Sequence, residues 1–127
     1  VGENPQKEDT VYWDKNTLEK FLQPVIDWQK QYNIPANKIV VGEFGVNRLM
    51  QGAKDYLFDV RNLFVKYGFM HAFYAFREPH FPRMDYELGT AKNIGSYWLS
   101  LENKMSPNYE KLRKPELIDA LGISILK

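Results

Sequence analysis

Apolar side chains recur at helical spacing in two long segments of this chain. The positions that follow this spacing in the first segment are Leu18, Phe21, Leu22, Val25, Gln29 and Tyr32. Asn16 lies three residues before Glu19, so we expect a capping box there, and Pro24 should kink the helix or divide it. The positions that share one face of a second helix, over 52–67, are Ala53, Leu57, Val60, Phe64 and Tyr67. Gly68 is expected to end that helix as its C′ residue.

Two further segments have the residue types of strands. Residues 38–44 form a short β-branched run between the two helices, and residues 69–76 are rich in aromatic side chains. A polar loop with prolines follows over 77–90. We expect helices in the apolar stretch 94–101 and in 115–121, where Pro115 lies in the first turn and Gly122 comes after the end.

The order of these elements is typical of an α/β fold. Strands that alternate with helices of this length indicate parallel units with right-handed crossovers. Two parallel strands have edges and faces that two or three helices cannot cover, and a (β/α)₈ barrel needs typically ~250 residues, about twice this length. We therefore expect the carboxyl-terminal part of a larger fold, or a fold completed by another chain. The first residue is Val1, without an initiator Met or apolar leader, which is expected of a processed, cut or truncated polypeptide.

Composition restricts the partners. The 17 basic and 16 acidic residues give a net charge of +1, so the charge gives no reason to expect binding to nucleic acid or to an anionic membrane. There is no cysteine, which excludes disulfides, thiolate nucleophiles and cysteine-ligated zinc. No apolar run approaches the ~18 residues of a membrane span. Aromatic residues make up 15% of the chain, which suits either a large core or a surface that stacks on flat ligands such as sugars.

Glu43 is the candidate with the most specific context. It follows the β-branched run and lies between Gly42 and Gly45, which permit a sharp turn or a close backbone approach. In α/β folds the carboxyl end of a strand is where side chains reach substrate. The alternative is a strand-end glutamate that is merely solvated or caps another group.

Four segments carry motifs that belong together. They are residues 24–29 (Pro-Val-Ile-Asp-Trp-Gln), 39–48 (Ile-Val-Val-Gly-Glu-Phe-Gly-Val-Asn-Arg), 73–78 (Phe-Tyr-Ala-Phe-Arg-Glu) and 84–89 (Met-Asp-Tyr-Glu-Leu-Gly). These segments resemble family 5 glycoside hydrolases, members of the cellulase-like clan of (β/α)₈ barrels. The first two look like the seventh β/α unit, and the last two look like the eighth strand and the loop after it. The resemblance implies that residues 1–127 are the carboxyl-terminal segment of one catalytic barrel domain, with the rest on another polypeptide or missing.

The resemblance also implies an activity. Glu43 would be the nucleophile of a retaining hydrolase that cleaves a β-linked glycan, as an endo-β-1,4-glucanase does, without a cofactor and outside the cell. Such enzymes use a second carboxyl group as acid and base, which the family takes from an Asn-Glu-Pro segment. That segment does not occur here, because Glu3-Asn4-Pro5 has the wrong order. We therefore expect the chain to be inactive by itself and to need an amino-terminal fragment that carries the acid/base glutamate.

Several residues are candidates for contact with the glycan. The resemblance places Trp13 where a sugar subsite could form, and Tyr74 and Phe76 near the position at which the family usually presents a stacking tryptophan. His80 is a candidate for contact with sugar, and the favoured alternative is an exposed loop histidine without that role. Arg48 either lines the cleft or orients its loop, and we favour the second role.

Other polar and aromatic residues have structural interpretations. A satisfied structural role is favoured for His71, and neither histidine has a partner at metal-ligand spacing, so no metal is expected. The charged residues that either bind sugar hydroxyls or form a salt-bridge cluster are Arg77, Glu78, Asp85 and Glu87. Trp28 and Trp98 are expected to be packing residues. The competing class of function is a non-catalytic carbohydrate-binding or structural half-barrel that lacks the acid/base.

Overall fold

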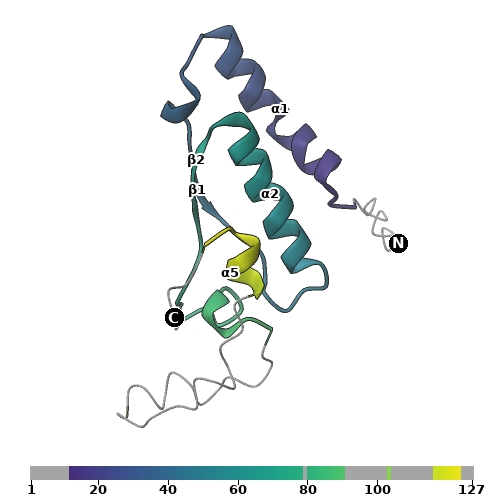
Figure 1. The fold of residues 1–127 in the computed structure, drawn as a ribbon, viewed down its shortest axis with the longest axis vertical. Helices are drawn as coiled ribbons and strands as arrows, with labels where there is room; N and C mark the ends of the chain where they lie inside the picture. The colour runs from purple at the N-terminus through teal and green to yellow at the C-terminus, as the bar shows by residue number, and fades with distance from the viewer. Residues whose placement is uncertain (1–11, 79, 91–102, 104–115, 124–127) are drawn as a thin grey trace, which may run out of the picture.

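The computed structural model describes residues 12–78, 80–90, 103 and 116–123 (Figure 1). In this part of the chain the elements are α1 (Lys15–Gln31), the 3₁₀-helix η1 (Ala36–Lys38), β1 (Val40–Phe44), α2 (Ala53–Tyr67), β2 (Met70–Phe73), the 3₁₀-helix η2 (Tyr86–Leu88) and α5 (Glu116–Ala120). The two strands pair in parallel, and α2 connects them. This single β/α/β unit neither establishes a barrel nor excludes one.

The two strands are in a register that is interrupted once. Val40 pairs with Met70 and Phe44 pairs with Phe73, with an irregularity between Val41 and Glu43. The backbone N–H of Tyr74 donates to the carbonyl of Phe44 over 2.9 Å, which extends the pairing one residue beyond β2. The carboxyl ends of both strands therefore lie side by side.

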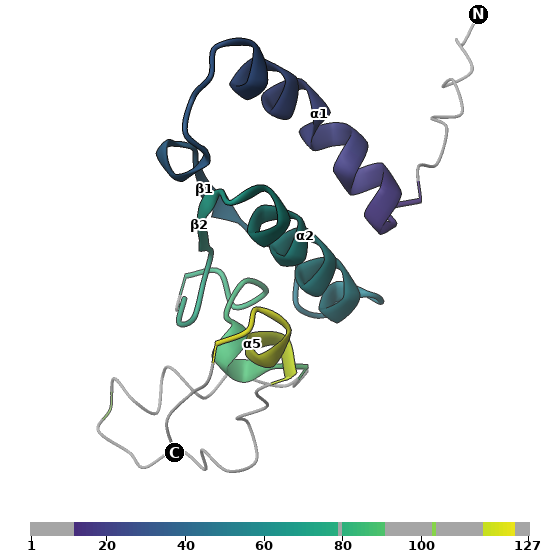
Figure 2. The same ribbon diagram turned by 45° about the horizontal axis from the view of Figure 1, so that its top comes forward.

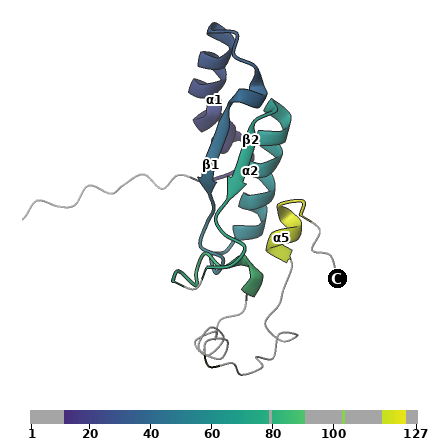
Figure 3. The same cartoon turned by 90° about the vertical axis from the view of Figure 1, so that its left-hand side faces the viewer.

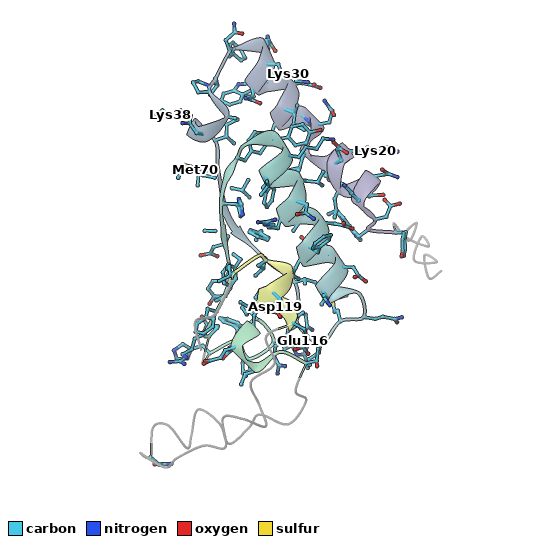
Figure 4. All side chains as sticks on the ribbon, in the orientation of Figure 1. Lys20, Lys30, Lys38, Met70, Glu116 and Asp119 are labelled. Atoms are coloured by element: carbon cyan, nitrogen blue, oxygen red, sulfur yellow. The ribbon has the colours of Figure 1, made fainter. Side chains whose placement is uncertain are left out.

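Both long helices cover the same face of the sheet (Figures 1 and 3). On this side a cluster joins α1, α2 and the start of β2, and its buried members are Leu18, Ile26, Val60, Leu63, Phe64 and Phe69. The opposite face is open, since Val40 is 63% exposed and Met70 is 55% exposed. The side chain of Met70 points away from α2 (Figure 4). The exposed face is the one that a larger α/β fold would cover.

α1 differs from the sequence-based expectation in two respects. Its N-cap is Asp14, whose carboxylate accepts the N–H of Thr17 over 2.8 Å, so the capping box expected at Asn16 is wrong. Asp14 has extended backbone dihedrals that aim its carboxylate at the first turn, whereas Asn16 is already helical. Of the two outcomes expected at Pro24, a kink or a division, the division is wrong, because α1 continues through the proline from Lys15 to Gln31. The proline is exposed, so water can hydrogen-bond to the backbone carbonyl that loses its helical partner. Leu18 and Ile26, on opposite sides of the proline along α1, pack into one cluster, which favours a continuous helix.

α2 follows its expected pattern closely. The predicted inner face is confirmed for its buried members Ala53, Leu57, Val60 and Phe64. Gly68 ends the helix in the left-handed conformation at φ 71°, and its N–H bonds to the carbonyls of Phe64 and Val65. This confirms the role expected of Gly68.

The strands are shorter than predicted. Residues 36–38 form η1, so β1 begins at Val40 and not at Lys38. After Phe73 the backbone turns to the following loop, with Ala75 bonded to Met84 and Tyr86 bonded to Ala75, so residues 74–76 leave the strand. The final helix is confirmed as α5, which packs against α2 and beside η2 (Figure 2). The helix expected over 94–101, with Trp98, lies outside the described residues. In the described part of the chain, no helix is both long and apolar enough to cross a membrane.

Candidate active site

Glu43 lies at the second-last position of β1, opposite Ala72 of β2. Side chains of paired residues project from the same face of a sheet, and Ala72 shares its face with Met70. Glu43 is exposed and therefore belongs to the open face of the sheet, at the carboxyl ends of both strands. A substrate could reach its carboxylate from this side.

Tyr74 follows β2 directly, and the charge of Glu43 is one of the influences on its pKa. Its hydroxyl donates a hydrogen bond to the carboxylate of Glu78. This bond, followed by burial and by the negative charges of Glu78 and Glu43, raises the pKa of Tyr74 to about 12. The peptide bond between Tyr74 and Ala75 is cis. Tyr74 is thus a neutral phenol whose hydroxyl is held by the carboxylate of Glu78.

Two hydrogen bonds favour the ionised form of Glu78. It accepts the Tyr74 hydroxyl and the backbone N–H of His80, the latter over 2.8 Å, and these bonds lower the pKa of Glu78. A general acid must hold a proton near neutral pH. Glu78 is therefore suited to positioning Tyr74 and is a poor choice for the missing acid.

Arg48 connects the two loops at the carboxyl end of the sheet. Its side chain is 1% exposed. The guanidinium donates to the carbonyls of Pro82 over 2.6 Å and Gly89 over 2.7 Å. Burial lowers the pKa of Arg48, and the charge of Asp85 raises it. These contacts are those expected if Arg48 orients its loop. The guanidinium is buried and does not line an open cleft.

Tyr86 was not singled out by the sequence, yet it forms the base of this region. Its hydroxyl accepts the N–H of Val46 over 2.7 Å and donates to the carbonyl of Val46 over 3.0 Å. Burial raises the pKa of Tyr86. A Cβ at Gly45 would lie 2.6 Å from this hydroxyl and 2.5 Å from the carbonyl oxygen of Tyr74. The glycine at position 45 is therefore required by close packing.

The loop after β2 is also held by an ion pair. Arg77 donates two hydrogen bonds of 2.7 Å to Glu87, whose side chain is buried. The guanidinium of Arg77 also lies 5.8 Å from the ring centroid of Phe76. Arg77 and Glu87 therefore form a salt bridge, which is one of the two roles that the sequence left open for them. Phe76 keeps part of its ring exposed beside this pair.

The two histidines occupy different surroundings. The Nδ1 of His71 lies 3.1 Å from the carbonyl of Phe69, and its ring contacts Phe44 and Phe64. This is the satisfied structural role favoured from the sequence. His80 is exposed in the loop next to Glu78. Among the described residues, no group of three His, Asp or Glu side chains is arranged to hold a metal ion.

Trp13 and Glu43 do not line the same groove. The ring of Trp13 stacks on Phe21 at 4.7 Å and lines a groove with Gly45 and Val46, of which Glu43 is not a part. Trp28, expected to be a packing residue, is 49% exposed, and its ring contacts that of Tyr32. Trp28 is therefore not buried in the core that the described residues form.

The sequence did not predict the hydrogen bonds of the tyrosines in this region. The pairing of Tyr74 with Glu78 had a weak signal, since a tyrosine at a strand end four residues before a glutamate can reach it. The role of Tyr86 had no local signal, because its partner Val46 is remote in sequence.

Comparison of the chain with protein-family models, curated proteins and solved structures found no match.

Proposed function

We propose that this chain is the carboxyl-terminal part of a family 5-like (β/α)₈ glycoside hydrolase and supplies its nucleophile, Glu43. The observation that carries the proposal is the position of Glu43, exposed on the open sheet face at the carboxyl ends of two parallel strands. A carboxylate at this place in an α/β fold is available to substrate. The motifs around it provide the second line of support.

The proposed reaction is retaining hydrolysis of a β-linked glycan such as a β-1,4-glucan. Glu43 attacks the anomeric carbon and the glycosidic bond breaks, while an acid protonates the leaving oxygen. The same acid/base group then activates water, which releases the sugar from Glu43. The exposed faces of Tyr74 and Phe76 are proposed to contact the sugar, with His80 in the adjoining loop. Arg48 would act through the position of that loop.

The acid/base group is proposed to come from an amino-terminal polypeptide. The two carboxyl groups of a retaining enzyme lie about 5–5.5 Å apart. Among the described carboxylates beyond β2, Glu78 is held ionised by two hydrogen bonds and Glu87 is paired with Arg77. Neither is a suitable proton donor. The open face and open edges of the sheet are the surface that such a polypeptide would complete.

A non-catalytic role is the second candidate. The observation in its favour is that the carboxylate associated with Tyr74 is an ionised hydrogen-bond acceptor and not an acid. A half-barrel that kept its scaffold could bind carbohydrate or complete another domain without cleaving a bond.

Covalent labelling separates the two candidates. The chain is combined with an amino-terminal fragment that carries an Asn-Glu-Pro segment, and the active preparation is treated with a 2-deoxy-2-fluoro β-cellobioside bearing a good leaving group. We expect a mass increase of one glycosyl unit on the peptide that contains Glu43. The Glu43→Gln variant should remain unlabelled and lose hydrolysis, by at least about 10³-fold, because covalent catalysis requires the carboxylate.

Glu78→Gln is the matched control, since it alters a carboxylate of the same region without removing the nucleophile. It should still take up the label. Label on any residue other than Glu43 in an active preparation would refute the assignment. Carbohydrate binding without labelling or hydrolysis would support the non-catalytic candidate.

A further inference from the structure

A groove lies outside the proposed catalytic face, where the two long helices begin. It has a volume of about 820 Å³, within the usual range of ligand sites. Its walls are residues 12–14 before α1, residues 45–46 after β1, residues 50–53 that lead into α2, and three side chains from the first turns of α2. Glu43 is not among the lining residues, so the groove does not contain the proposed nucleophile.

An exposed indole forms one wall of the groove. Trp13 stacks on Phe21 with 4.7 Å between the ring centroids and 27° between the ring planes, and it is still 52% exposed. A cation over the face of an aromatic ring is attracted by the ring quadrupole, and tryptophan attracts it most strongly. Because the contact with Phe21 holds the indole before a ligand arrives, stacking on it costs little further conformational entropy.

Among the described residues that line the groove, every charged side chain is a carboxylate. They are Asp14, Asp55 and Asp59. Asp14 is engaged in capping α1, where it accepts the N–H of Thr17. Asp55 and Asp59 form no ion pair with another residue of the described chain. The groove therefore presents two carboxylates whose charge the described chain does not neutralise.

The two aspartates of α2 repel each other. Asp55 and Asp59 are four residues apart, on the same side of the helix, and like charges at this spacing destabilise a helix. Asp55 lies in the first turn, where the positive end of the helix dipole favours a negative charge. Asp59 lies one turn further along and lacks this compensation. A bound cation would relieve the repulsion, whereas a neutral ligand would leave it in place.

A flat organic cation fits this groove better than a metal ion does. In the described part of the chain, no group of His, Asp or Glu side chains is arranged to hold a metal ion. A guanidinium group is planar, so it can stack on an indole while the N–H groups at its edge donate to carboxylates. It is also more weakly hydrated than an ammonium group, which lowers the cost of removing it from water.

We propose that this groove binds a guanidinium group, with Trp13 as the stacking surface and Asp55 and Asp59 as the acceptors. The ligand class is a small compound or a polypeptide that carries an arginine-type side chain. This site goes beyond the proposed function, because it does not involve Glu43 and its ligand is a cation and not the glycan.

The first test uses matched ligands on the unaltered full chain. Calorimetric titration at low ionic strength compares acetyl-Gly-Arg-Gly-amide with acetyl-Gly-citrulline-Gly-amide, in which a neutral urea of similar shape replaces the guanidinium. We expect saturable binding of the arginine peptide, weakened by added salt, and binding of the citrulline peptide that is at least about tenfold weaker, because the charge interactions are lost. Equal affinities for the two peptides, or no binding of the arginine peptide, would overturn the proposal.

The second test locates the binding site on the chain. Trp13→Ala, and Asp55→Asn combined with Asp59→Asn, should each weaken binding of the arginine peptide by about tenfold. The matched controls are Trp28→Ala and Asp27→Asn, which remove an exposed tryptophan and an exposed aspartate of α1 outside the groove, and both should bind like the parent chain. Losses in the controls as large as those in the groove variants would place the peptide elsewhere and refute the site.

Two further ligands distinguish the source of the guanidinium and the glycan. If acetyl-arginine amide binds as tightly as the tripeptide, the site is supported and a small guanidino compound is its ligand. If it binds more weakly, the site is supported and an arginine within a polypeptide is its ligand. Cellotetraose should not displace the arginine peptide. Displacement by cellotetraose, with binding of this sugar that Trp13→Ala removes, would assign the groove to the glycan and overturn the proposal.

Discussion

At the scale of single residues, the pKa of Tyr74 depends on the carboxylates at the proposed catalytic face. Its hydrogen bond to Glu78 favours the neutral phenol in the folded chain, with a pKa of about 12 against an ordinary 10.0. This contribution to stability is complete below pH 10 and is lost as pH rises through about 12. We expect Glu78→Gln to lower the pKa of Tyr74 toward its ordinary value, because the variant removes the ionised acceptor. Titration of the tyrosine ¹³Cζ resonances by NMR measures this, with Tyr74→Phe giving the assignment.

Glu43→Gln provides the control for this measurement. The charge of Glu43 also raises the pKa of Tyr74, but as the smallest of its causes. The variant should therefore lower that pKa less than Glu78→Gln does. A larger effect of Glu43→Gln, or no change with either variant, would contradict the hydrogen-bonded arrangement of Tyr74 and Glu78.

Arg48 illustrates which part of the site can be predicted from the sequence at this scale. The strand-end position of Glu43 follows from a local pattern of β-branched residues and glycines. The burial of Arg48 depends on carbonyls 34 and 41 residues further along the chain. Local spacing carries no information on such contacts, so the sequence could favour the loop-orienting role of Arg48 but could not name the carbonyls that it binds.

At the scale of elements, the end of β1 is held close to the segment after β2. A Cβ at Gly45 would meet the backbone carbonyl oxygen of Tyr74 at 2.5 Å, and a backbone atom cannot rotate away. We expect Gly45→Ala to lower the free energy of unfolding by about 1–3 kcal/mol, the usual cost of overpacking. Urea unfolding followed by circular dichroism measures the change.

Gly42 is the matched control within the same strand. A Cβ at this position meets nothing within 4 Å. Gly42→Ala should therefore change the free energy of unfolding by no more than about 0.5 kcal/mol. Equal losses for the two variants would show that a general requirement for glycine, and not the contact with Tyr74, explains position 45.

Elements were predicted well wherever local chemistry decides them. The inner face of α2 and the role of Gly68 follow from helical spacing and from the left-handed conformation that glycine tolerates. The predicted start of α1 was wrong because Asp14 and Asn16 are both residue types that favour the N-cap position, and only the backbone dihedrals distinguish them. Pro24 was expected to kink or divide the helix, and the division does not occur, because packing of Leu18 and Ile26 on both sides of it outweighs its local preference.

At the scale of the whole molecule, the described chain leaves one face of a parallel sheet uncovered. Parallel sheets are usually buried on both faces, and their strands pair on both edges. Single exposed apolar residues are ordinary on protein surfaces, but Val40 and Met70 are paired neighbours on the open face. A surface of this kind favours association with another polypeptide.

This arrangement predicts how the isolated chain behaves in solution. We expect its weight-average mass in sedimentation equilibrium to rise with concentration above the 15.0 kDa of one chain. Met70→Lys and Val40→Lys should each lower that mass toward the single-chain value, because a charge on the open face opposes its burial. Phe81→Lys, which alters an exposed apolar residue in the loop after β2, should have no such effect. If the loop variant lowers the mass and the strand variants do not, the association surface lies outside the sheet, and the expectation that missing strands cover this face loses its support.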